Sequence, residues 1–224
     1  MNHPSSLLLG LALIATGATA RDGVALVIDP KSYTEARTEI DDYARAIREV
    51  DGRPTYIVED RWGVPDSLRA ALHRLYSQDR DPIVGAVLIG DIPVVMVRDG
   101  QHLTSAFKML QSRPREESSV PSDRFYDDFS LRFDYVGRDS VQPYFYYSLA
   151  AESAQHTRPD LFSGRIRPTD AGGTSRYAKL RDYLRKATRQ KRQPEPVRST
   201  LVYTGSGSLS ESKVAHIGEM HAMH

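Results

Sequence analysis

The chain has 224 residues, of which 40% are hydrophobic, and this suffices for one large domain or for one domain and part of another. Thirty basic residues against twenty-nine acidic ones give a net charge of +1, which argues against a general nucleic-acid binder. The sequence contains no cysteine, and this excludes disulfides and a cysteine nucleophile within these residues.

Residues 1–20 have the pattern of a secretory signal peptide. They carry no charged side chain, and an apolar run at 7–15 is followed by the small residues Ala18 and Ala20. Cleavage is expected after Ala20, which predicts a secreted or periplasmic protein with no membrane span once the signal is removed. Because no Lys or Arg precedes the apolar run, an uncleaved anchor stays open as the alternative.

The next segments alternate between strand and helix patterns. Residues 24–28 predict a strand, and the capping box Ser32-Tyr33-Thr34-Glu35 predicts the start of a helix that ends at Gly52. The inward face of this helix is expected to carry apolar residues at helical spacing, namely Ala36, Ile40, Tyr43, Ile47 and Val50.

Residues 54–59 predict a second strand, and Pro65 predicts the start of a second helix. Residues 83–91 then form an apolar run without polar alternation, which is typical of a parallel strand covered on both faces. The order β-α-β-α-β predicts an α/β fold with an open, mostly parallel sheet and helices on both faces. Asp91 ends the third strand, and it is interpreted either as a ligand-facing acid or as a cap of the following turn.

The alternation stops over an insertion at about 92–157. Residues 102–110 suggest a short helix, and strand patterns at 131–136 and 144–149, joined by 137–140, predict a hairpin. An excursion of this length after a central strand is usually functional or disordered, and its aromatic content favours order.

After the insertion, residues 158–166 predict another strand, and a long helix follows Thr174, with Tyr177, Leu180, Leu184 and Ala187 on its buried side. Between Arg176 and Arg192 this helix carries eight basic residues against one acid. Two interpretations stay open: a solvated face with cations near the helix C-terminus, or a surface for an anionic partner.

The end of the chain begins another strand at 199–205 and another helical pattern from Ser210. The predicted organisation is a signal peptide at 1–20, a first α/β subdomain at 21–196, and the start of a second, truncated α/β subdomain at 197–224.

Three motifs admit ligand-binding interpretations. The turn Gly205-Ser206-Gly207-Ser208 suggests phosphate binding, but the third glycine of the dinucleotide motif is missing, and a flexible turn is the alternative. His221 and His224 are one turn apart and suggest zinc, although the metal content is unknown. The three acids Asp123, Asp127 and Asp128 make calcium a candidate ligand, with a simple acidic turn as the alternative. No Gly-x-Ser-x-Gly motif supports a serine hydrolase.

Three pieces, taken in order, resemble the gingipain family of secreted cysteine peptidases. They are residues 85–93, ending Gly-Asp-Ile-Pro; residues 120–126, with Ser122-Asp123 and Tyr126; and residues 159–166, with Gly164-Arg165. The resemblance covers about residues 23–205. It implies a caspase-like catalytic unit of two side-by-side α/β subdomains, of which this chain contains the first.

In that family the second subdomain supplies the histidine and the cysteine nucleophile, and neither a His-Gly pair nor a cysteine occurs here. The resemblance implies that Asp160 is an accessory acid that orients the histidine, while pairing with Arg158 or Arg165 is the alternative. The expected function is the amino-terminal part of an exported cysteine endopeptidase that acts on protein or peptide substrates, requires no cofactor and is inactive as this chain. The alternative is a non-catalytic exported α/β binding or scaffold domain of the same ancestry.

Overall fold

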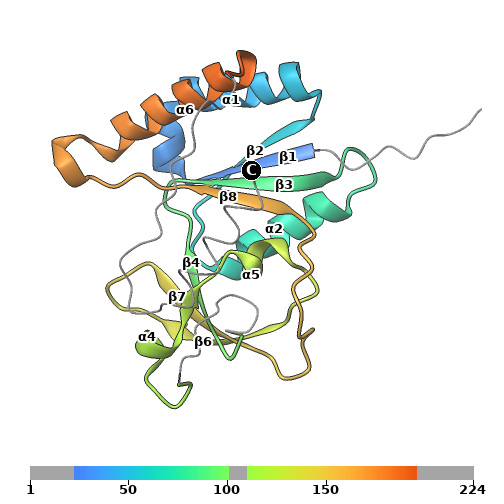
Figure 1. Ribbon diagram of the computed structural model, residues 1–224, viewed down its shortest axis with the longest axis vertical. Helices are drawn as coiled ribbons and strands as arrows, with labels where there is room; N and C mark the ends of the chain where they lie inside the picture. The colour runs from blue at the N-terminus through green and yellow to red at the C-terminus, as the bar shows by residue number, and fades with distance from the viewer. Residues whose placement is uncertain (1–22, 101–109, 196–224) are drawn as a thin grey trace, which may run out of the picture. The chain divides into compact units, whose positions relative to one another are not determined.

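The computed structural model describes residues 23–100 and 110–195 (Figure 1). The predicted signal peptide at 1–20, most of the predicted short helix at 102–110 and the predicted second subdomain at 197–224 lie outside the described residues. The chain divides after Arg192 into two units, and all the elements described here belong to the first. In chain order they are β1 (Gly23–Ile28), α1 (Pro30–Asp51), β2 (Thr55–Glu59), α2 (Pro65–Ser77), β3 (Ile83–Ile89), β4 (Val94–Arg98), α4 (Arg115–Ser118), β5 (Val120–Pro121), α5 (Arg124–Asp127), β6 (Phe133–Arg138), β7 (Tyr144–Leu149), β8 (Phe162–Ile166), a 3₁₀ turn (Ala171–Gly173) and α6 (Arg176–Arg192).

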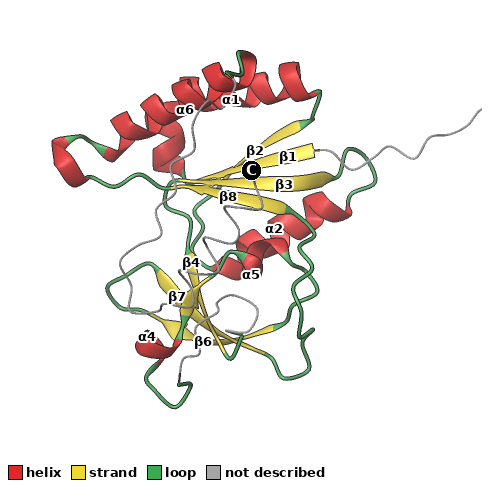
Figure 2. Cartoon of the chain, in the orientation of Figure 1, coloured by secondary structure: helices red, strands yellow, loops and turns green. Residues whose placement is uncertain are grey.

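Four strands form a parallel sheet in the order β2-β1-β3-β8. Helices α1 and α6 cover one face of this parallel sheet, and α2 lies on the other (Figures 1 and 2). The predicted α/β fold, with an open parallel sheet and helices on both faces, is therefore confirmed.

Strand β1 is central, and its side chains alternate between two hydrophobic cores. Val24, Leu26 and Ile28 point toward α1 and α6, whereas Ala25 and Val27 point toward α2. All six residues of β1 are buried, which explains why the strand is apolar throughout and shows no polar alternation.

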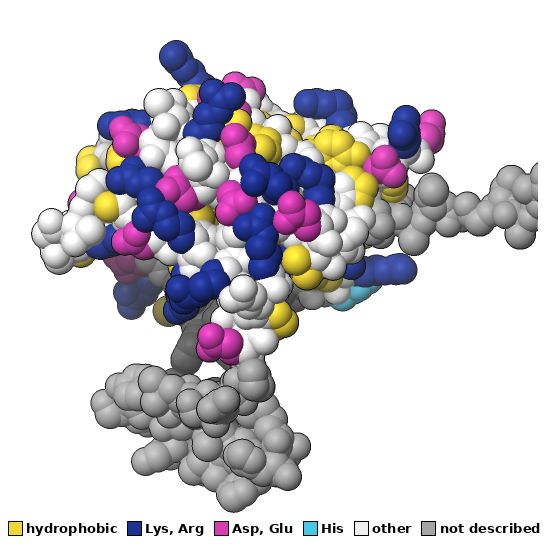
Figure 3. Space-filling model, turned by 90° about the horizontal axis from the view of Figure 1, so that it is seen from above, with side chains coloured by type: hydrophobic (Ala, Val, Ile, Leu, Met, Phe, Trp, Pro, Cys, Tyr) yellow, Lys and Arg dark blue, Asp and Glu magenta, His cyan; other side chains and the backbone are white. Residues whose placement is uncertain are grey.

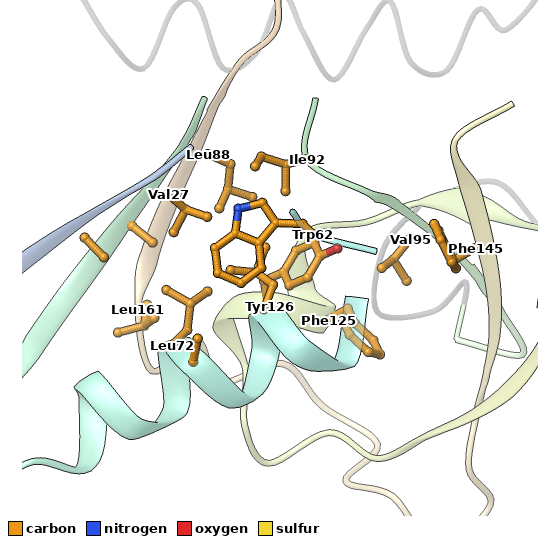
Figure 4. Close-up of a cluster of buried hydrophobic side chains, with 14 of the residues drawn as sticks. Val27, Trp62, Leu72, Leu88, Ile92, Val95, Phe125, Tyr126, Phe145 and Leu161 are labelled. Atoms are coloured by element: carbon orange, nitrogen blue, oxygen red, sulfur yellow. The ribbon is translucent and has the colours of Figure 1, made fainter. Parts of the chain in front are cut away.

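The core on the α2 side joins the parallel sheet to the insertion (Figure 4). The indole of Trp62 lies within it and donates its Nε1–H to the Ile28 carbonyl at 3.1 Å, which satisfies a buried polar group. The other labelled side chains come from the parallel sheet, from α2 and from the insertion: Val27, Leu72, Leu88, Ile92, Val95, Phe125, Tyr126, Phe145 and Leu161.

Helix α1 begins earlier than predicted, and the predicted capping box is wrong. Asp29 is the N-cap, and its Oδ1 accepts from the backbone N–H groups of Lys31 at 3.1 Å and Ser32 at 3.0 Å. An acid that directly follows a strand was available as a cap, and Pro30 fits the first helical position. Ser32 is instead buried within the helix, and Val50, predicted to face inward, is 49% exposed.

The insertion forms a second sheet, in the order β5-β4-β7-β6, which mixes parallel and antiparallel pairs. The predicted hairpin is confirmed as β6 and β7, although β6 continues through Gly137 and Arg138. Strand β4 was missed because its partner β7 lies about fifty residues later, and the local pattern gives no sign of so distant a pairing. Residues 158–161 precede β8 instead of belonging to it.

The basic side chains of α6 find acidic partners on α1. Five ion pairs, made by four basic residues of α6, join the helices: Arg181 to Glu35, Arg185 to Glu39, Lys191 to Asp51, and Arg192 to both Asp42 and Glu49. Figure 3 shows the two charges interleaved on this face. Most of the cationic charge of α6 is thus neutralised within the domain, which argues against the anionic-partner interpretation on this side of the helix. Leu180 and Leu184 are buried as predicted, and Thr188 continues the buried line more deeply than Ala187.

Candidate functional site

The carboxyl ends of the parallel strands bring two acids together, and this end of the sheet is the candidate site. Asp29 follows β1 and Asp91 follows β3, which is its neighbour. The Asp29 carboxylate caps α1 through Oδ1, while its Oδ2 accepts the backbone N–H of Asp91 at 2.7 Å. Asp29 therefore occupies the anion position that a helix N-terminus offers, and it ties two strand ends together.

Gly90, which directly precedes Asp91, allows this arrangement. Its backbone has a φ of 84°, a left-handed conformation that glycine adopts readily. A Cβ atom at this position would lie 2.1 Å from Asp29 Oδ2 and 2.2 Å from Ser32 Oγ. No side chain fits here without displacing the Asp29 carboxylate.

The carboxylate of Asp91 faces basic side chains from beyond β8. Arg176, the first residue of α6, binds both of its oxygens, and Arg167 Nε lies 3.8 Å from Oδ1. The hydrogen bond to Asp91 raises the pKa of Arg176 above its ordinary value, so this guanidinium is permanently charged. No described turn amide donates to the Asp91 carboxylate, and the predicted turn cap is therefore wrong. Asp91 remains 47% exposed and can reach a ligand only by competing with Arg176.

Asp160, the predicted accessory acid, lies at the other end of the sheet, just before the amino end of β8. Its Oδ1 accepts the Tyr76 hydroxyl at 3.0 Å, and its Oδ2 accepts the backbone N–H of Phe129 at 2.8 Å. Both oxygens are engaged within the domain, so these contacts favour a structural role, and the accessory role stays a prediction. Neither of the alternative partners forms a described ion pair with Asp160: Arg165 pairs with Asp123, and Arg158 donates its backbone N–H to Asp128.

The three acids proposed for calcium each bind different partners within the domain. Asp123 pairs with Arg165, Asp127 pairs with Arg124, and Asp128 accepts from the backbone N–H groups of Ser130 and Arg158. Within residues 23–100 and 110–195 no three metal-ligating side chains converge. The calcium site remains a prediction without a described set of ligands, and the zinc and phosphate motifs lie outside the described residues.

Asp127 is the most strongly perturbed of these acids. It is fully buried, its Oδ2 accepts from Ser163 Oγ at 2.5 Å, and the same oxygen forms an ion pair with Arg124 Nη2 at 2.8 Å. Its Oδ1 is also buried and has no hydrogen-bond partner among the described residues. Burial raises the pKa of Asp127 to about 6, and the hydrogen bond from Ser163 and the charge of Arg124 offset only part of this effect.

Arg69 on α2 holds the acidic segment in place, and the sequence analysis missed it. Its guanidinium donates to the backbone carbonyls of Phe125, Asp128 and Leu131 at 2.7–3.1 Å. Burial lowers its pKa, and Asp128 is the largest opposing influence. A single arginine within an amphipathic helix gives no signal of such a role, since its partners are carbonyls about sixty residues away.

Two further findings bear on the function of the chain. Among the described residues no helix is long and apolar enough to cross a membrane. Comparison of the chain with protein-family models, with curated proteins and with solved structures gave no match. The functional interpretation therefore depends on the residues and their arrangement alone.

Proposed function

We propose that this domain is the first of two α/β units of an exported gingipain-like cysteine endopeptidase whose substrates are proteins or peptides. The nucleophile and the general base would come from outside these 224 residues, because the sequence contains neither a cysteine nor a His-Gly pair. The chain alone would then be inactive, since an accessory acid cannot run acyl transfer without a nucleophile.

One observation carries the proposal: the three sequence pieces of the resemblance meet in space. Arg165 of the third piece donates to the Ile92 carbonyl at 2.9 Å in the first piece and binds Asp123 at 2.7 Å in the second. Tyr126 of the second piece donates its hydroxyl to the Pro93 carbonyl of the first at 2.9 Å. The three pieces that carry the resemblance therefore contact one another at one place in the domain, and this supports the proposal.

The position of α6 also supports a unit that ends at β8. Helix α6 lies on the same face of the parallel sheet as α1. The connection through α1 leads from β1 to its neighbour β2, which is the direction away from β8. A right-handed crossover on that face must move in the same direction. A parallel strand that follows α6 would therefore move toward β3, where the place is occupied, and it could not lengthen the sheet beyond β8.

The alternative is a non-catalytic exported binding or scaffold domain, and the contacts of Asp160 favour it. Each oxygen of Asp160 already accepts one hydrogen bond, from Tyr76 or from Phe129, so a histidine from a second unit would have to share an oxygen with one of them. The two proposals share the same fold for this domain. They differ in whether a second unit supplies a nucleophile and a general base.

The decisive experiment recovers the natural protein with an antibody against this domain. The recovered protein and the recombinant 224-residue product are each treated with a thiol-directed peptidase probe and with casein. Labelling and hydrolysis by the recovered protein alone would support the peptidase. A recovered protein that is neither labelled nor active would favour the scaffold, and casein hydrolysis by the 224-residue product would contradict the proposed division of catalytic groups.

The role of Asp160 is tested in the recovered enzyme's recombinant form with Asp160→Asn, and with Asp134→Asn on the exposed side of β6 as the matched control. A positioning role predicts a fall in kcat with an unchanged free energy of unfolding. A structural role predicts a loss of about 1–3 kcal/mol of unfolding free energy, because one donor is left without an acceptor.

A further inference from the structure

The outer edge of β8 is open in the described part of the chain. Strand β8 pairs only with β3, and the Ile166 carbonyl accepts from Gly90 on the β3 side. Because the backbone groups of alternate residues in a parallel strand point to opposite sides, those of Ser163 and Arg165 face away from β3. No described residue bonds to them. This edge is therefore able to accept a further strand.

One end of the edge is closed, and this defines the usable length. The backbone N–H of Leu161, the preceding group on the outer side, donates to the Asp127 carbonyl at 3.1 Å. Helix α5 thus blocks the amino end, and the free stretch extends from Ser163 toward Arg167. A short extended segment fits such a stretch, and a long strand does not.

A groove of about 320 Å³ runs beside this edge, between β8 and α6. Its walls include Ile166, Pro168 and the ring of Tyr183, which is 52% exposed. It therefore offers an apolar surface next to free backbone donors and acceptors, the combination that recognises a peptide by strand addition.

The charged side chains of the groove are all basic: Arg165, Arg167 and Lys179. Asp123 neutralises Arg165, but Lys179 donates only to the carbonyls of Thr169 and Ala171, and Arg167 is 3.8 Å from the shared Asp91. The groove thus keeps a net positive charge in the described structure. This charge favours an acidic occupant.

We propose that the β8 edge and this groove bind an extended acidic peptide of a partner protein, which adds to the parallel sheet as a fifth strand. Alternate side chains of an added strand lie on one face, so acidic residues at every second position would face Lys179 and α6. The chain's own predicted strand at 199–205 is a poor occupant, because a right-handed crossover through α6 leads away from this edge. The proposal is independent of peptidase activity.

The test measures fluorescence anisotropy of the 224-residue protein with three labelled peptides. The first alternates Glu with Val, the second replaces each Glu by Lys, and the third is the Glu peptide with alternate backbone amides methylated. Saturable binding of the first peptide alone is expected. Equal binding of the methylated peptide would exclude strand addition, equal binding of the Lys peptide would exclude the charge argument, and absence of binding to the Glu peptide would overturn the proposal.

Variants locate the site. Arg167→Glu and Lys179→Glu should each weaken binding of the Glu peptide roughly tenfold, since each reverses a charge beside it. Arg74→Glu, an exposed change on α2 across the sheet, is the matched control and should leave binding unchanged. Equal weakening by Arg74→Glu would mean general charge attraction and would overturn the proposal. Sedimentation without peptide serves as a further check, because a dimer abolished by Arg167→Glu would assign the edge to a second copy of the chain instead.

Discussion

Arg165 and Asp123 form a two-pronged ion pair that joins the fourth strand of the parallel sheet to the segment before α5. Nη2 lies 2.7 Å from Oδ1 and Nε lies 3.1 Å from Oδ2, while Nη1 reaches the Ile92 carbonyl at 2.9 Å. Both side chains are mostly buried, so the pair is shielded from solvent screening.

We expect Arg165→Ala to lower the free energy of unfolding by about 2–3 kcal/mol, because it leaves Asp123 and the Ile92 carbonyl without their donor. Arg165→Lys should recover only part of the loss, since an ammonium cannot make the two-pronged contact. Urea denaturation provides the measurement. Arg80→Ala, at a residue that is 95% exposed, is the control and should stay within about 0.5 kcal/mol of the wild type.

The buried carboxyl of Asp127 predicts a pH dependence with a definite sign. Its pKa is about 6 in the folded protein against an ordinary value of 3.8, so the folded state binds the proton more tightly than the unfolded one. The protonated carboxyl of Asp127 therefore contributes stability that is present below about pH 4 and is lost as the pH rises through about 6. The loss in the free energy of unfolding is roughly 3 kcal/mol. Arg124, Ser163, Asp123 and Asp128 are the polar groups that face it.

Asp127→Asn removes the titrating group while keeping its shape. We expect the variant to match the wild type near pH 4.5 and to exceed it by about 2 kcal/mol at pH 7.5, because the wild type then holds a buried charge. Urea denaturation at both pH values measures the difference. A variant that is less stable than the wild type at pH 7.5 would show that the Arg124 pair outweighs the cost of burial.

The crowding at Gly90 predicts a severe effect from a single methyl group. Gly90→Ala should destabilise the domain by more than about 3 kcal/mol, since it adds a left-handed alanine and a clash with Asp29 and Ser32. Gly172→Ala is the matched control, because Gly172 has φ of 78° but open space around its Cβ position. Thermal unfolding should show a loss of only about 1–2 kcal/mol there. Similar losses at both glycines would mean that backbone strain, and not contact with Asp29, sets the cost.

The ion pairs between α1 and α6 should respond to salt. Arg185→Gln, which removes the partner of Glu39, is expected to cost about 0.5 kcal/mol at low ionic strength, and the cost should vanish near 1 M salt because the pair is partly exposed. Arg189→Gln changes the same charge on the same helix without a described partner, and it should have no measurable effect. Persistence of the Arg185 effect at high salt would point to packing of its aliphatic stem instead.

The sequence pattern predicts those parts of the fold whose partners are near in the chain. The apolar runs of β1 and β3, the stripes of α1 and α2 and the β6–β7 hairpin all follow from local periodicity or from a turn. Strand β4 and the role of Arg69 do not, because both depend on partners roughly fifty to sixty residues away. The start of α1 was misplaced since two caps, Asp29 and Ser32, competed, and only the structure shows which carboxylate or hydroxyl reaches the free amides.

The candidate site was less predictable than the fold. The apolar run before it identifies Asp91 as an acid at a strand end, and the family resemblance points to Asp160, but neither shows whether the carboxylate oxygens are free. The answer depends on Arg176 and Tyr76, which approach from other elements.

The alternation of β1 between two cores has a consequence for how this domain can change. The insertion side chains that join one of the two cores all lie in the core on the α2 side, and the core beneath α1 and α6 contains none of them. The two layers share a backbone but no side-chain packing. Descendants of this fold could therefore shorten, replace or elaborate the segment between β3 and β8 while the α1–α6 layer keeps its sequence, so variation should accumulate on one side of the sheet and conservation on the other.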